Sequence, residues 1–66
     1  MEQITVRNRF LEFKKVNGTS NQFVANQIKC DRSTISKFTT GKDLPIPLLI
    51  KLDNFITNTI DKLNRL

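Results

Sequence analysis

The chain has 66 residues, of which 38% are hydrophobic, and a formal net charge of +5. Because a chain this short buries only about 60% of the surface that its unfolded form exposes, we expect one domain of modest stability. No segment approaches the apolar length of a membrane span, and the first ten residues lack the apolar block of a secretory signal, so we expect a cytoplasmic protein.

The first predicted helix covers residues 5–16 and ends at Asn17-Gly18, since glycine readily adopts the left-handed conformation that closes a helix. Its apolar residues recur at helical spacing and therefore define a stripe that faces the core. The stripe comprises Val6, Phe10, Phe13 and, at its end, Val16.

A second helix is predicted to begin at about Asn21. Thr19 and Ser20 can cap its first backbone N–H groups, and Gln22 lies three residues after Thr19, the spacing of a capping box. Phe23 lies one position off the inward face, and we place it on the flank of the first helix. The inward face itself comprises Val24, Ala25 and Ile28.

Residues 32–40 are predicted to form a third helix. Asp31 precedes it, and its carboxylate can accept hydrogen bonds from the first free N–H groups of the helix. Gly41 ends the helix, and two prolines exclude helix from the next loop until Pro47 takes the first helical position. The inward residues of this third helix are Ile35 and Phe38.

From Pro47 to the end nothing breaks a helix, and apolar residues recur at heptad spacing. At about 1.5 Å per residue this helix would reach roughly 30 Å, the diameter of a small domain, so its outer half has little to cover. We interpret residues 47–56 as the lid on the core and residues 56–66 as a surface for a second copy of the chain. The predicted dimerisation residues are Ile56, Ile60, Leu63 and Leu66. The alternative is a shorter helix that folds back after Asn54 to complete its own core.

Residues 21–42 have the pattern of two short helices joined by a tight turn. Ala25 lies at the point where these two helices are expected to cross. A small side chain is required there, because a larger one would push the second helix away and misplace the third. With the apolar residues inward, one polar face of the third helix is left outward. That face comprises Arg32, Ser33, Ser36 and Lys37, the residues that can enter a DNA major groove.

Over residues 20–42 the chain resembles, without a gap, the phage-repressor type of helix-turn-helix, the Cro and xenobiotic-response-element-like family. The residues of resemblance are Ala25, Ile28, Arg32-Ser33-Thr34-Ile35-Ser36-Lys37-Phe38 and Gly41-Lys42. The resemblance implies an all-α, lambda-repressor-like DNA-binding domain of four or five helices that regulates transcription and usually binds an operator as a dimer. It covers most of residues 5–56, and with the long C-terminal helix we expect a single domain over residues 1–66.

Two positions depart from the family pattern. Lys29 stands where the family usually has glycine in the turn, and a lysine at positive φ costs about 1 kcal/mol or more, so we expect a slightly different turn. Thr39 stands where the family often has a glutamate, so the ion pair that such an acid would make to the first helix, at Lys14, is not expected.

The outward residues have defined expected roles. Arg32 can donate two parallel hydrogen bonds to guanine, Lys37 can reach a guanine or a phosphate, and Ser33 and Ser36 are short hydrogen-bonding groups for base edges. The amide of Asn21 and nearby N–H groups at the start of the second helix can hold a phosphate. The free backbone of Gly41, after the third helix, can hold another. The residues expected to contact phosphates are Asn21, Thr34, Gly41 and Lys42.

All the excess positive charge lies in residues 1–42, which hold eight Lys or Arg against three acids, whereas residues 43–66 hold three of each. One basic half is typical of a chain with a side that faces a polyanion, although ordinary solvated charge produces the same division. We therefore predict a sequence-specific regulator that binds double-stranded DNA as a homodimer at a near-palindromic operator. A repressor of phage or mobile-element type, without cofactor, metal or small-molecule ligand, is the expected form.

An enzyme is not expected, because the chain has no histidine, no glycine-rich phosphate loop and no paired carboxylates at useful spacing. Cys30 is the only thiol; we expect it to be buried, and it has no second cysteine or histidine with which to share a zinc ion. The rival prediction is a protein-interaction module, such as an antitoxin or accessory factor, built on the same helices. Salt dependence separates the two, because only phosphate binding weakens steeply as salt rises.

Overall fold

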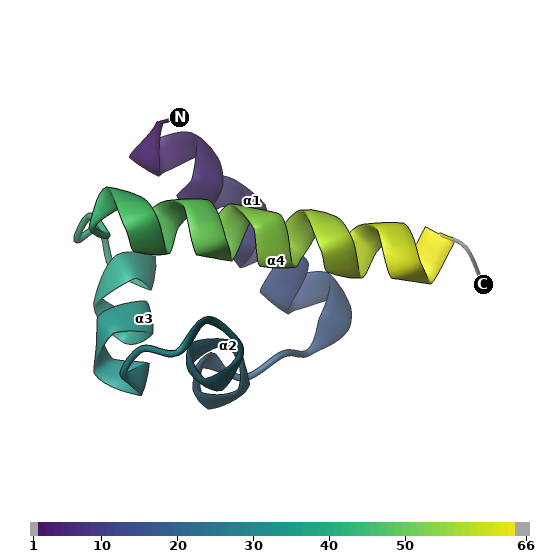
Figure 1. Cartoon of the computed structure of the whole chain (residues 1–66), viewed down its shortest axis with the longest axis horizontal. Helices are drawn as coiled ribbons and strands as arrows, with labels where there is room; N and C mark the ends of the chain where they lie inside the picture. The colour runs from purple at the N-terminus through teal and green to yellow at the C-terminus, as the bar shows by residue number, and fades with distance from the viewer. Residues whose placement is uncertain (1, 65–66) are drawn as a thin grey trace.

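The computed structural model describes residues 2–64, which form four helices and no strand (Figure 1). α1 spans Gln3–Asn17, α2 spans Asn21–Ile28, α3 spans Arg32–Thr39 and α4 spans Ile46–Asn64. The predicted all-α class is confirmed, and the helices begin and end close to the predicted residues. Within this part of the chain, no helix combines the length and the apolar character needed to cross a membrane.

The four helices are arranged as two packed pairs. Figure 1 shows α4 running along the molecule in front of α1, with α2 and α3 together on one side. α2 packs against α3, and α4 packs against both α1 and α2. The C-terminal end of α4 extends past the other helices.

One cluster of buried apolar side chains, to which every helix contributes, holds the fold together. The inward residues predicted for α1, α2 and α3 belong to it, with one exception. Val16 is 71% exposed, because α1 ends one residue later, where its last turn no longer packs on α4 closely enough to cover it. The buried cluster comprises Val6, Phe10, Phe13, Val24, Ala25, Ile28, Ile35, Phe38, Leu44, Leu49, Leu52 and Ile56.

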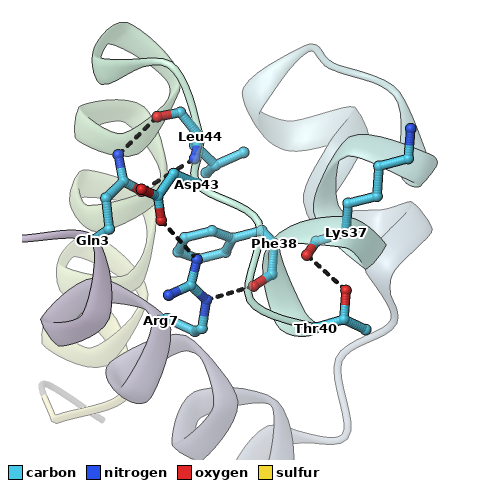
Figure 2. A network of polar contacts seen from close by, with 7 residues as sticks. All are labelled: Gln3, Arg7, Lys37, Phe38, Thr40, Asp43 and Leu44. Carbon is cyan, nitrogen blue, oxygen red and sulfur yellow. Dashed lines mark hydrogen bonds and ion pairs between the residues drawn. The ribbon is translucent and has the colours of Figure 1, made fainter.

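The loop between α3 and α4 is attached to the start of α1 by a two-way contact (Figure 2). Gln3 donates from Nε2 to the Leu44 carbonyl oxygen at 2.8 Å, and its Oε1 accepts from the Leu44 N–H at 3.1 Å. The Leu44 side chain is buried in the core. The loop is therefore held at both its backbone and its side chain, which positions the end of α3 relative to α4.

α4 is a single helix from Ile46 to Asn64, so the alternative in which the chain folds back after Asn54 is wrong. The predicted dimerisation stripe also needs correction at its first residue. Ile56 is fully buried in the core of its own chain, because α1 packs over this part of α4. Ile60 and Leu63 are 39% and 50% exposed, and Leu66 lies outside the described residues.

Candidate nucleic-acid interface

The start of α2 is capped, although not by the predicted capping box. The Ser20 hydroxyl oxygen accepts a hydrogen bond from the Phe23 N–H at 3.1 Å. Gln22 instead donates to the side chain of Asn26, one turn later on the same helix. Phe23, expected on the flank of α1, packs against Phe55 of α4, with ring centroids 6.3 Å apart.

The turn between α2 and α3 keeps the left-handed geometry despite its lysine. Lys29 has φ 60° and ψ 57°, and the next N–H, that of Cys30, donates to the Ala25 carbonyl oxygen at 2.9 Å. The expectation of a different turn is therefore wrong, because these backbone hydrogen bonds hold Lys29 in a conformation that usually needs glycine. Ala25 is fully buried at this crossing.

α3 begins directly after the turn, at Arg32, and Asp31 is its N-cap residue. Its carboxylate makes no hydrogen bond to the helix, contrary to the predicted cap, and its carbonyl oxygen accepts from the Thr34 N–H at 3.1 Å. Cys30, expected to be buried, is only partly so. Partial burial and then the neighbouring Asp31 carboxylate raise the pKa of the Cys30 thiol, against an opposing effect of Lys51.

α3 has one buried face and one outward face. Ile35 and Phe38 are fully buried, as predicted, and Arg32, Ser33 and Lys37 are exposed. Because residues three and four apart share a helix face, these exposed side chains lie on one side of α3. Figure 2 shows Lys37 extending away from the side of α3 that contacts α1.

Ser36 connects this outward face to the start of α2. Asn21 donates from Nδ2 to the Ser36 hydroxyl at 3.2 Å, and its Oδ1 accepts from the Lys14 ammonium. Both polar atoms of the Asn21 side chain are thus engaged within the chain, so a phosphate contact from this amide would require it to exchange partners. Lys14 therefore bonds to Asn21, and not to an acid at position 39 as in the family pattern. The hydroxyl of Thr39 donates to the Ser36 carbonyl oxygen.

The segment after α3 folds back onto the helix end. The N–H groups of Thr40 and Lys42 both donate to the Lys37 carbonyl oxygen, at 3.1 and 3.0 Å. The Gly41 N–H donates to the Phe38 carbonyl oxygen at 3.2 Å, so it is already used and the expectation of a free backbone there needs correction. The Lys42 side chain is exposed beside this turn, and Thr34 is half-buried on the flank of α3.

Ion pairs divide the basic residues into two groups. Arg7 pairs with Asp43, and Arg9 pairs with Asp53. Across residues 2–64, Arg32, Lys37 and Lys42 make no ion pair. The cations that α1 contributes to the charge excess are therefore partly neutralised, whereas those of α3 and the following turn keep their full charge at the surface.

The spacing of the outward residues includes a position that the sequence reasoning missed. Thr40 follows Ser36 by four residues and Lys37 by three, and it is exposed. Its hydroxyl donates to the Lys37 carbonyl oxygen at 2.9 Å (Figure 2). The same helical spacing that selected Arg32, Ser33, Ser36 and Lys37 would have found it.

No protein-family model, curated protein or solved structure matches this chain. Its function therefore has to follow from its own residues and their geometry. That geometry joins a polar outward face on α3, the start of α2 through Asn21, and the turn at Lys42.

Proposed function

We propose that this protein is a cytoplasmic transcriptional regulator, of repressor type, that binds a specific sequence in double-stranded DNA with α3 in the major groove. One observation carries the proposal. α3 exposes Arg32, Ser33 and Lys37 on one face while Ile35 and Phe38 anchor the opposite face in the core. An exposed, cationic helix face on a rigid support is the element that helix-turn-helix proteins insert into DNA.

The finer assignment, a lambda-repressor-like domain, is supported by the α2–α3 pair and its left-handed turn at Lys29. It is also supported by the resemblance of residues 20–42 to the phage-repressor family, which includes the outward residues. In this proposal two copies of the chain bind a near-palindromic operator, with half-sites about 34 Å apart, one turn of DNA.

Arg32 is the proposed reader of guanine, because its guanidinium can donate two parallel hydrogen bonds to O6 and N7. Lys37, Ser33 and Ser36 supply further groups for base edges. Lys42 and Thr34 hold phosphates on either side of the helix, and the first N–H groups of α2 hold another. Thr40 extends the outward face by one turn, and its hydroxyl would contact DNA by exchanging its hydrogen bond to the Lys37 carbonyl oxygen.

The proposal is tested in two steps. Selection from random duplex DNA identifies a bound sequence, and affinity is then measured for that sequence and for random DNA over a range of salt concentrations. We expect a steep loss of affinity as salt rises, because each phosphate contact releases counterions. Affinity that does not change with salt would instead favour the protein-interaction module.

Arg32→Ala tests the base reader. We expect its affinity for the selected sequence to fall about 5- to 150-fold, the range of one bidentate base contact, with a smaller loss on random DNA. Lys51→Ala removes an exposed positive charge from α4 and is the matched control, with a small and equal effect on both DNAs. Equal losses for Arg32→Ala on both DNAs would remove Arg32 from the base-reading role.

A further inference from the structure

An apolar hollow of about 560 Å³ lies between the second half of α1 and the end of α4. Val16 of α1 and Leu63 of α4 stand at its edges, 71% and 50% exposed. Phe13 and Ile56 line it from the core side, since both are buried. Large apolar side chains exposed together in this way are costly in water and usually mark a surface that another protein covers.

The hollow has two walls, and this distinguishes it from the exposed stripe of a single helix. One wall is α1, and the other is α4 beyond the point where α1 covers it. A helix that enters the hollow therefore contacts α1 as well as α4, in the manner of an amphipathic helix in a groove. The chain itself contains such a helix end, with Ile60 and Leu63 on one side, extending past the rest of the domain (Figure 1).

Exposed charges beside the hollow allow one ion pair between two copies. Glu12 lines the α1 wall and Lys62 lies next to Leu63 on α4; both are exposed, and neither is in an ion pair within residues 2–64. Arg9 on the same wall is already bound to Asp53 and Thr57. Asp61 at the α4 end is likewise exposed and in no ion pair within residues 2–64, so this end brings charges of both signs, of which Lys62 can pair with Glu12 of a second copy.

We propose that the hollow receives the α4 end of a second copy of the chain, and that the exchange is reciprocal. Each copy carries both the hollow and the helix end. In a two-fold dimer each hollow therefore holds the α4 end of the other copy, and the exposed apolar surfaces of both copies are buried. This interface includes Val16 of α1, which a coiled coil of two α4 helices would leave exposed. The dimer forms without DNA; only its use of two half-sites rests on the proposed function.

The first test is the oligomeric state in the absence of DNA, measured by sedimentation equilibrium. We expect the unmodified chain to dimerise, and Val16→Lys and Leu63→Asp each to raise the dimer dissociation constant at least about tenfold, the scale of a central interface contact. Leu11→Lys is the matched control, because Leu11 is an exposed apolar residue of α1 that does not line the hollow. Circular dichroism checks that all variants keep their helices.

The second test mixes the two defective variants. In a reciprocal exchange, a Val16→Lys chain and a Leu63→Asp chain form one contact between the new lysine and the new aspartate and one unmodified contact between Val16 and Leu63. The mixture should therefore dimerise more tightly than either variant alone. In a coiled coil of two α4 helices, position 63 faces its counterpart, and mixing would restore nothing.

Three results would overturn the inference: a monomeric unmodified chain, dimerisation of Val16→Lys equal to that of Leu11→Lys, or no recovery in the mixture. If the unmodified chain is monomeric, a second copy is not the partner of the hollow, and a different protein becomes the candidate. Failure here is distinct from failure of the proposed function, because a monomer can still bind one half-site with a steep salt dependence. A dimer that does not bind DNA would support the proposed interface and contradict the proposed function.

Discussion

The guanidinium of Arg7 lies over the ring of Phe38, with its Cζ 4.6 Å from the ring centroid, while its Nε donates to the Phe38 carbonyl oxygen at 2.6 Å (Figure 2). Its Nη2 also pairs with Asp43 at 3.1 Å. One α1 side chain therefore contacts the inner ring of α3, the backbone at the end of α3 and the loop that follows. Arg7 thus positions the C-terminal end of α3 against α1.

Replacing Arg7 with methionine should lower the free energy of unfolding by about 1–3 kcal/mol, since a carbonyl loses a charged hydrogen-bond donor and the ring loses its cation. Methionine keeps much of the apolar stem. Urea unfolding measures the change, and Arg32→Ala is the control, with an expected change within about 0.5 kcal/mol because it is exposed. Similar stabilities for the two variants would contradict a structural role for Arg7.

Lys29→Gly should raise the free energy of unfolding by about 1 kcal/mol. An L-residue at φ 60° is strained by its Cβ atom, whereas glycine is not, and this gain exceeds the entropy that glycine adds to the unfolded chain. Lys29→Ala is the matched control: it removes the charge and keeps the Cβ, so thermal unfolding should change little. A loss of stability in the glycine variant would mean that the lysine side chain, not the backbone, matters at this turn.

Ile56 and Ile60 lie one turn apart on α4 and differ in burial, 0% against 39% exposed. Ile56→Val should cost about 1 kcal/mol, the usual loss for one methylene group in a packed core. Ile60→Val should cost less than about half as much in dilute protein, where the monomer predominates. Equal losses in chemical unfolding would place both residues in the same environment and contradict the burial of Ile56 in its own core.

The thiol of Cys30 should react more slowly with iodoacetamide than the same thiol in the urea-denatured chain. Its raised pKa means that the folded state disfavours the thiolate, so the rate should reach half its maximum at a higher pH than in the denatured chain. By linkage, the stability from the neutral thiol is fully present below the ordinary thiol pKa and is lost as the pH rises from that value through the raised pKa of the folded state. An exposed reference thiol is provided by Ile4→Cys combined with Cys30→Ser, because Ile4 is 60% exposed and does not line the hollow; identical pH profiles for the two thiols would contradict the shift.

The helices and most of the core could be predicted because apolar residues at helical spacing must face inward in any compact arrangement. Ile35 and Phe38 are examples, and the outward position of Arg32 followed from them. Spacing carries no information about where a domain ends, however. The apolar stripe of α4 continues at the same period through Ile56 and Leu63, and only the position of α1 determines which of the two is covered.

Polar contacts between distant parts of the chain were outside the reach of sequence reasoning. Arg9 finds Asp53 across 44 positions, and Asn21 joins Lys14 to Ser36, because the helices cross at particular points. A pattern of charges along the chain cannot distinguish a paired arginine from a free one. The turn at Lys29 was mispredicted for a related reason: local conformational preference was overridden by the backbone hydrogen bonds around it.

The side chains of Arg32, Ser33 and Lys37 make no hydrogen bond or ion pair within residues 2–64, in contrast to Ser36, which is bound to Asn21. Substitutions at these three positions, other than to proline or glycine, should therefore carry only a small penalty in folding. Folding therefore leaves the outward face free to change, and only what it binds constrains it, while the scaffold beneath it stays constant. A combinatorial library at the three positions that omits proline and glycine should yield mostly folded variants, so new binding preferences can be sought without redesigning the domain.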